Sequence, residues 1–300
     1  MMQRLQPIFL QLSQQFSRWY AQRLEPWLFR RRRPERLMAF GLTEVSLLPM
    51  ADLQLGQADV LTQQPLYRRY QRYYRQFFHQ QPDWTAALDP AGIAMLLPLI
   101  DFAGAADFSQ KLKKKSGNMW REAEKARRAG FTVQALQIAN YSPDLLALRR
   151  SRKVRAFGPV LEAFTLTLAD LGGAPQQWQP LQPPVSTEYF DYYLGVFRPQ
   201  PGYLQGAVQT DQQLVAYVRL HRIGNTVRYA ELMGHAAFQS AGVMSLLHLD
   251  VLKFLLDPAN SLGVGVQYLS YGALEQGSDG LIFWKRKALF QPMRLQLPPV

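Results

Sequence analysis

The first residues of the chain place apolar side chains at intervals of three and four positions. These apolar positions are Leu5, Ile8, Phe9, Leu12, Phe16, Trp19, Tyr20 and Leu24. They share one face of an amphipathic helix that we expect to end near Pro26, before the basic run Arg30–Arg33. The polar residues of the opposite face include Gln11, Gln14, Arg18 and Gln22. Such a helix either lies on an anionic membrane surface or packs on the protein or a second subunit. Because polar residues interrupt it, we expect neither a signal peptide nor a membrane span.

A second stretch interleaves arginine with aromatic residues. At helical spacing, one face carries Leu66, Tyr70, Tyr73 and Phe77, and the other carries Arg68, Arg72 and Arg75. The pattern favours a core-facing aromatic stripe with solvated arginines, and the alternative is a surface on which nucleic acid bases stack. The apolar run Gly92–Phe102 then indicates a buried strand.

The segment from Phe108 to Gly130 has the clearest helical pattern of the first half. Its apolar stripe contains Phe108, Leu112, Met119, Ala123 and Ala126, and its basic face contains Lys111, Lys114, Arg121, Lys125 and Arg128. Gly117 weakens the helix interior by about 1 kcal/mol relative to alanine, so we expect a kink there. Gly130 is placed to end the helix before a strand at Phe131–Leu136.

The remainder of the chain alternates strand-like and helix-like runs. In order, we expect a surface loop at 173–184, a helix at Glu188–Phe197, strands at Leu204–Gln209, Leu214–His221 and Val227–Met233, a helix at Val243–Leu256, a strand at Val264–Leu269, a helix at Asp279–Leu289 and a strand at Gln291–Leu297. This order predicts an α/β fold in which the strands share one mixed sheet and the apolar helix Val243–Leu256 packs on it.

Composition narrows the function classes. The chain has 300 residues, of which 48% are hydrophobic and 19% charged, as expected for a globular protein of one large or two small domains. The absence of cysteine excludes disulfides, a thiol nucleophile and cysteine-ligated metals. The four histidines are scattered singly, so we expect no metal site.

The net charge of +12 is concentrated in clusters. These are Arg30–Arg33, Arg68–Arg75, Lys111–Lys115 and Arg149–Arg155. A phosphate-bearing small molecule such as coenzyme A, an anionic membrane surface and RNA all fit this pattern, and so does a surface that is basic without a specific partner.

The loop Gln239–Gly242 lies between a predicted strand and the start of the apolar helix. A glycine-containing turn that opens a helix presents free backbone N–H groups and the positive end of the helix dipole. Such a loop can hold a phosphate, and the alternative is a plain helix cap formed by Ser240.

Three segments resemble the GNAT family of N-acyltransferases. Leu281–Pro292 is similar to the family's FKRKLGFxP ending, with Trp284 where Phe is usual, and Leu214–Tyr217 is similar to the opening of its third strand. Arg121–Gly130 resembles the basic RxAxKAxxxG helix of Fem-type peptidyltransferases. The resemblance covers residues 108–300 and is closest to Fem-like members, which have two copies of the fold.

The resemblance implies a division of the chain into three parts. Residues 1–36 form the basic amphipathic N-terminal helix, and residues 108–300 form the GNAT-like acyltransferase domain. Residues 37–107 form an N-terminal subdomain, for which we expect a degenerate first copy of the fold.

The resemblance also implies a donor site. Gln239 and Gly242 match the family pattern Gln/Arg-x-x-Gly-x-Gly/Ala, whereas Met244 replaces its last small residue. The expected cofactor-binding residues are Gln239, Ser240, Ala241, Gly242 and Val243. The amides of the last three would hold the pyrophosphate of acyl-CoA, although in Fem-like members an aminoacyl-tRNA is the donor.

Acyl transfer to an amine requires a base for the ammonium proton and a proton donor for the leaving group. In a regular strand Tyr229, Glu231 and His235 point to one side of the sheet. We therefore expect Glu231 or His235 to act as base, and Tyr271, on the fifth strand of the GNAT plan, to act as the acid or to donate a hydrogen bond to the leaving sulfur.

The resemblance thus predicts an acyl or aminoacyl transferase that modifies an amino group, for example on a cell-envelope precursor. A tRNA donor is the sole nucleic acid partner that we expect. The expected location is cytoplasmic, with peripheral attachment to the inner membrane face through the N-terminal helix. The alternative function is a GNAT-fold scaffold that has lost its cofactor, which the bulk of Met244 would explain.

Overall fold

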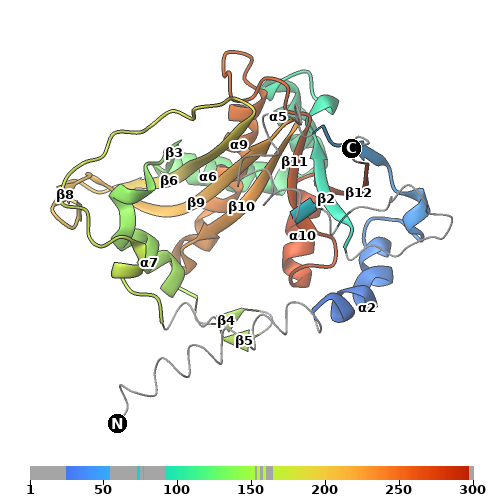
Figure 1. Cartoon of the computed structure of the whole chain (residues 1–300), viewed down its shortest axis with the longest axis horizontal. Coiled ribbons are helices and arrows are strands. Elements are labelled where there is room, and N and C mark those ends of the chain that lie inside the picture. Colours follow the sequence, from blue (N-terminus) through green and yellow to red (C-terminus); the bar gives the residue numbers. More distant parts are fainter. Residues whose placement is uncertain are drawn as a thin grey trace, which may run out of the picture.

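The computed structural model describes residues 25–54, 73–74, 77, 92–152, 154–155, 158–159 and 165–296. The predicted helix before residue 25 and most of the aromatic–arginine stretch lie outside these residues. Among the described helices, none is long and apolar enough to cross a membrane. The fold is a mixed α/β arrangement around an eight-stranded sheet with the order β1-β12-β2-β11-β10-β9-β6-β3 (Figure 1).

The antiparallel part of the sheet comes from residues 132–234. It consists of β3 (Thr132–Ala135), β6 (Tyr189–Pro199), β9 (Gln212–Ile223) and β10 (Thr226–Gly234). Gly224, in the tight turn between β9 and β10, has the positive φ of 53° that such a turn requires. Strand β9 pairs with the long strands β6 and β10, one on each side, and is almost completely buried.

The other part of the sheet mixes residues from both ends of the described chain. It consists of β11 (Tyr268–Ala273), β2 (Ala94–Pro98), β12 (Gln291–Gln296) and β1 (Met50–Asp52). β2 pairs antiparallel with both β11 and β12, whereas β1 pairs parallel with β12. Residues between 37 and 107 therefore complete the same sheet as the C-terminal residues, while the division into three parts stays a prediction.

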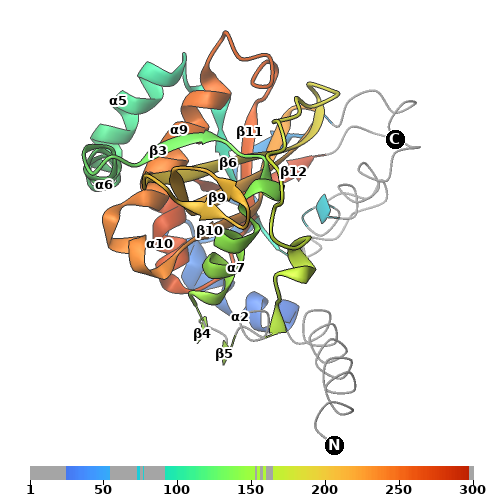
Figure 2. The ribbon, with the colours of Figure 1, turned by 90° about the vertical axis from the view of Figure 1, so that its left-hand side faces the viewer.

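Helices cover both faces of the sheet. Their bounds are α2 (Glu25–Met38), α5 (Ala105–Lys115), α6 (Gly117–Arg128), α7 (Ser142–Arg150), α9 (Val243–Leu256) and α10 (Asp279–Lys287). Figure 2 shows α5, α6 and α9 on one side of the sheet. α9 is buried over most of its length, as its apolar sequence predicts, and the predicted kink at Gly117 is a break between α5 and α6. On the other face, α7 packs against Phe197 and Tyr217.

Short elements connect these layers. The 3₁₀ turns are Val45–Leu47, Leu99–Asp101, Ile138–Tyr141, Ala169–Leu171 and η6 (Ala236–Ala241). Two small hairpins are formed by β4 (Val154–Arg155) with β5 (Gly158–Pro159), and by β7 (Leu204–Gln205) with β8 (Val208–Gln209).

Three sequence predictions were wrong. Glu188–Phe197 is not a helix but most of strand β6, because its aromatic and apolar residues pack between β3 and β9. Leu204–Gln209 does not join the main sheet, since it folds back on itself as β7 and β8. The strand predicted at Val264–Leu269 is β11, which begins at Tyr268 rather than Val264 because Gly265 turns the chain with a φ of 75°.

The arginine cluster lies inside α2 rather than after a helix that ends near Pro26. Pro26 occupies the first turn of α2, where a missing N–H costs little. Arg33 donates to the buried Glu275 at 2.6 Å, and Arg36 pairs with Asp279 at the start of α10. These two arginines therefore attach α2 to the C-terminal part of the fold.

Candidate functional site

The two central parallel strands diverge toward their carboxyl ends. β10 pairs with β11 from Thr226 to Arg228, opposite Tyr268 to Ser270. Beyond this register β10 continues to Gly234, and a β-bulge interrupts its pairing with β9 between Tyr229 and Glu231. In open α/β sheets, ligands bind outside the carboxyl ends of parallel strands.

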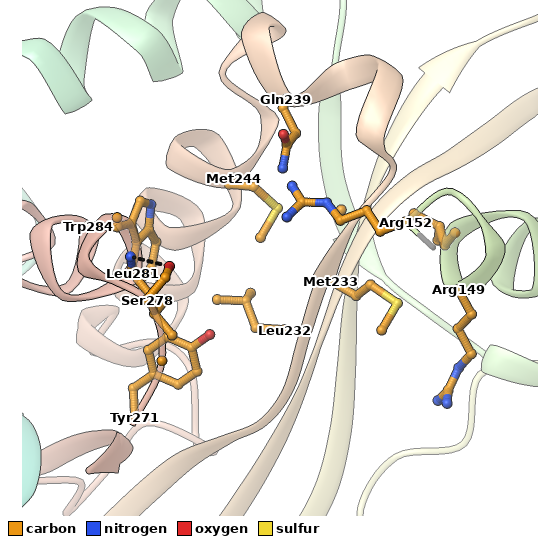
Figure 3. Close-up of a pocket in the computed structure, with 14 residues that line it drawn as sticks. Arg149, Arg152, Leu232, Met233, Gln239, Met244, Tyr271, Ser278, Leu281 and Trp284 are labelled. Atoms are coloured by element: carbon orange, nitrogen blue, oxygen red, sulfur yellow. Dashed lines mark hydrogen bonds between the residues drawn. The ribbon is translucent and has the colours of Figure 1, made fainter. Parts of the chain in front are cut away.

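A cavity of about 580 Å³ lies at this place, within the range of small-molecule sites (Figure 3). The described residues that line it include Leu232, Met233 and Gly234 of β10, Tyr271 of β11, Gln239 of η6, Met244 of α9, Leu148 and Arg149 of α7, Arg152, and Ser278, Gly280, Leu281 and Trp284 around the start of α10. Its walls are mainly apolar, with a few polar groups that can orient a ligand.

An aromatic wall closes one side of the cavity. The Tyr271 ring meets Tyr229 at 5.5 Å and Trp284 at 5.9 Å between centroids, in edge-to-face geometry. Figure 3 shows the hydroxyl oxygen of Tyr271 pointing toward Leu232. Behind this wall, Lys285 donates to the Ala273 carbonyl at 2.7 Å, and burial lowers the pKa of Lys285 to about 7. The packing fixes the Tyr271 ring beside the cavity.

The predicted donor loop reaches the cavity at a single described position. Of the residues Gln239, Ser240, Ala241, Gly242 and Val243, only Gln239 is among the described lining residues. Ser240 is exposed, Ala241 packs against the core, and Val243 is fully buried. The assignment of this loop to the donor stays a prediction.

Helix α6 covers the side of the loop that faces away from the cavity. Gly242 has a φ of 82°, and a side chain there would overlap the carbonyl oxygen of Glu122. Ser245 Oγ donates to the Glu122 carboxylate at 2.7 Å, and Lys125 Nζ donates to the Ser240 carbonyl at 3.0 Å. A carboxylate therefore already lies at the positive end of the α9 dipole, on this side.

Met244 narrows the cavity on the other side of the loop. A Cβ at Gly234 would lie 2.5 Å from Met244 Sδ, so the thioether packs directly on the glycine backbone. Met244 is the position at which the sequence departs from the small residue of the GNAT pattern. The unbranched side chain can change rotamer, which makes the gap between β10 and α9 adjustable.

The predicted alternation of Tyr229, Glu231 and His235 was wrong. Because of the β-bulge, Tyr229 faces α9 and bonds the buried His248 at 2.9 Å. Glu231 faces the opposite side, where its Oε2 accepts from Tyr217 at 2.9 Å and from Arg149 at 3.2 Å. A bulge adds one residue to a strand and so breaks its period of two.

His235 follows the last residue of β10 and caps η6. Its Nδ1 accepts from the Ala237 amide at 3.2 Å, and its ring packs on Phe238 at 5.6 Å. Neither His235 nor Glu231 is among the described residues that line the cavity, whereas Tyr271 is. Glu231 is nevertheless linked to the cavity through the lining residue Arg149.

Helix α7 and the residues directly after it contribute to this site, which was not predicted from the sequence. Arg149 and Arg152 line the cavity, and Figure 3 shows the Arg152 side chain extending toward Gln239 and Met244. The signal was present as the basic cluster Arg149–Arg155, but nothing in the sequence showed that it faces β10. Among the described residues, no group of three or more His, Cys, Asp or Glu side chains is arranged to hold a metal ion.

Comparisons with known proteins find similar structures but no matching sequence family. No family model and no curated protein matches the chain. The chain is similar to the C-terminal domain of a protein designated a lysylphosphatidylglycerol synthetase from Agrobacterium fabrum, with 12% identity, a TM-score of 0.37, and 67% of this chain and 58% of that chain covered.

Two further similar structures are named as acetyltransferase-type proteins. A GCN5-related N-acetyltransferase from Kribbella flavida has 11% identity and a TM-score of 0.33, over 67% of this chain and 54% of that chain. A tandem GNAT protein from the clavulanic acid biosynthesis pathway has 12% identity and a TM-score of 0.38, over 82% of this chain and 73% of that chain. The chain thus spans a little over half the length of the first two structures. Similarity to Fem-like proteins in particular stays a prediction.

Proposed function

We propose that the protein transfers an acyl or aminoacyl group from an activated donor to an amino group. The observation that carries this proposal is the cavity at the diverging ends of β10 and β11, bordered by Tyr271 and closed at its far side by the start of α9. The cavity offers an acyl group an apolar enclosure and places a hydroxyl beside it.

The donor that we propose is acyl-CoA, bound with its acyl thioester end in the cavity. In this proposal the acyl thioester end occupies the cavity of about 580 Å³, and the phosphates lie outside it. Arg152 and Gln239 at the cavity wall supply donors for an anionic group. An aminoacyl-tRNA is the alternative donor, and it would place an oxygen ester in the cavity, whose C–O bond would break in place of the C–S bond.

In the proposed reaction, the acceptor nitrogen attacks the acyl carbon, an N–C bond forms, and the C–S bond of the thioester breaks. Glu231 takes the proton released from the nitrogen, and the Tyr271 hydroxyl donates a proton to the departing sulfur. His235 is the second candidate base. These roles extend the sequence prediction and are supported by the link from Glu231 to the cavity residue Arg149.

A second candidate function is a scaffold that has kept the fold without the chemistry. The contact of Met244 with Gly234 and the position of Glu122 at the α9 N-terminus support it, because both oppose phosphates at the loop. Peripheral attachment to the inner membrane face is a further proposal, and it rests on the sequence pattern before residue 25.

Calorimetric titration of the purified chain with acetyl-CoA and with a long-chain acyl-CoA tests the proposal. We expect saturable binding, and Met244→Ala should bind at least as tightly as the wild type because it widens the cavity. Tyr271→Phe should bind the donor normally but lower kcat on the order of 100-fold. Absence of binding to either acyl-CoA and to aminoacyl-tRNA would favour the scaffold.

A further inference from the structure

The sheet face opposite α9 carries a polar cluster across its three central antiparallel strands. In the pairing register, Asp191 of β6 lies opposite His221 of β9, which lies opposite Arg228 of β10. The adjacent row consists of Tyr193, Arg219 and Glu231. Directly paired residues share one face of a sheet, so both rows form a single surface.

The bulge in β10 is what completes this surface. Arg228 and Glu231 are three positions apart, and in a regular strand they would face opposite sides. The extra residue at position 230 turns Glu231 to the side of Arg228. The conformation that disrupts the predicted alternation therefore places a carboxylate among arginines.

Ion pairs connect the two rows. Arg219 donates to Asp191 at 2.8 Å, and its other terminal nitrogen lies 3.9 Å from Oε1 of Glu231. His221 pairs with Asp191, and Arg149, which lies on α7, pairs with Glu231. The arginines outnumber the carboxylates in this cluster, which favours a ligand with an anionic group.

Within the part of the chain that the structure describes, the cluster has both hydrogen-bond donors and an acceptor that are not fully used. The Nε atoms of Arg219 and Arg228 are buried and have no hydrogen-bond partner, and one face of the Arg228 guanidinium is covered by the Tyr73 ring at 3.7 Å. Both described hydrogen bonds to the Glu231 carboxylate end on Oε2, so Oε1 can accept further donors. Buried polar groups are rarely left in this state without a function.

The cluster is accessible and adjoins the cavity. The side chains of Asp191 and Glu231 are 29% and 34% exposed, so a ligand can reach them. Arg149 belongs to both places, because it lines the cavity and bonds Glu231. A nitrogen held at Glu231 therefore lies on the same side of β10 as Met233 and α7, both of which contribute lining residues to the cavity.

We infer that this cluster, named here the sheet-face site, binds the acceptor, and that the acceptor is a zwitterion with an ammonium and a carboxylate, as in an α-amino acid. The ammonium binds Oε1 of Glu231, and the carboxylate binds the guanidinium groups of Arg219 and Arg228. This inference rests on the proposed function, since it names the molecule that receives the acyl group. Arginine pairs with carboxylates through two parallel hydrogen bonds, which fixes the orientation of the acceptor.

Titration of the full chain with each of the common L-amino acids, without any donor, tests the inference. At least one amino acid should bind saturably in the millimolar range or below. Its decarboxylated amine and its N-acetyl derivative should each bind more weakly by about tenfold or more, because each lacks one of the two charges.

Three variants assign the charges. Arg219→Gln and Arg228→Gln should weaken the binding of the amino acid by about tenfold or more and leave the binding of the decarboxylated amine unchanged. Glu231→Gln should weaken the binding of both compounds. Arg198→Gln, at the far end of β6, serves as the matched control and should bind like the wild type. Circular dichroism confirms that each variant is folded.

The inference and the proposed function fail in different ways. If acyl-CoA binds but none of the amino acids does, the inference is wrong and the proposed function stands. Equal binding of an amino acid and its decarboxylated amine also overturns the inference. If an amino acid binds with the expected charge dependence but no donor binds, the sheet-face site stands and the transfer reaction is wrong.

Discussion

On the side of the sheet that faces α9, Tyr229 and His248 form a fully enclosed polar pair, whereas on the other side Arg219 and Glu231 remain partly open to solvent. Because a carbonyl oxygen only accepts, His248 Nε2–H donates to the Ala288 carbonyl at 3.1 Å, and Nδ1 accepts from the Tyr229 hydroxyl at 2.9 Å. The sheet-face site keeps unused donors and an unused acceptor oxygen among the described residues.

The comparison separates two uses of polar residues on neighbouring positions of one strand. Polar groups that satisfy each other inside the core hold elements together, and here they tie α9 to β10 and to the end of α10. Polar groups that remain half-open and incompletely paired are available to a ligand. We therefore expect changes on the first face to affect stability and changes on the second to affect binding.

The largest expected effect is a loss of packing on the α9 face. Leu249 of α9 is fully buried in the main core, so Leu249→Ala should lower the free energy of unfolding by roughly 2–5 kcal/mol. Urea denaturation followed by circular dichroism measures it. Leu249→Met conserves volume and should cost less than about 1.5 kcal/mol. Equal stabilities of the alanine variant and the wild type would contradict the placement of the core.

An intermediate effect should appear as a pH dependence of stability. Burial lowers the pKa of His248 to about 4, whereas an unfolded histidine titrates near 6.5. The unfolded state therefore binds a proton first, so the stabilisation is complete above pH 6.5 and is lost as the pH falls toward 4. This residue alone should remove about 2 kcal/mol between pH 7 and pH 5.

The control for this prediction is His248→Gln, which keeps an amide at the position but does not titrate. Comparing urea denaturation of the two proteins at several pH values cancels the contributions of the other ionisable groups. The wild type should lose stability more steeply than the variant over this interval. Parallel curves would show that His248 is protonated as easily in the folded as in the unfolded chain.

The smallest expected effect is on the stability of an Arg219→Gln variant. Arg219 is 20% exposed and its partners are partly solvated, so its ion pairs should contribute no more than about 1 kcal/mol. The same denaturation assay measures this. A loss above roughly 2 kcal/mol would indicate that Arg219 is structural, and the contrast between the two faces would then disappear.

The hydrophobic pattern predicted much of the fold because the spacing of apolar residues is a local property of each element's sequence. The apolar helix Val243–Leu256 and the interruption near Gly117 were predicted correctly. Strand β6 was missed, since Tyr189–Pro199 contains few β-branched residues and shows no strict alternation of polar and apolar positions. Its pairing with β3 and β9 overrides this weak local preference.

The candidate site was predicted only in part. Tyr271 and Gln239 were named and line the cavity, but Arg149 and Arg152 were seen only as charge. A readable signal for the sheet-face site existed in β9, where Tyr217, Arg219 and His221 alternate with apolar residues. The alternation predicts a strand with one polar face, but it does not show which residues of β6 and β10 lie beside that face.

By itself, the sequence determined that the chain buries a large apolar core, which helix is central, and that basic residues occur in clusters. Those properties depend on residue type and on periods of two and 3.6, which the chain carries locally. The tertiary structure alone decided that β2 lies between β11 and β12, and that Glu231 faces away from Tyr229. Both depend on pairing between distant segments, and a single extra residue at a bulge reverses the side on which every later side chain lies.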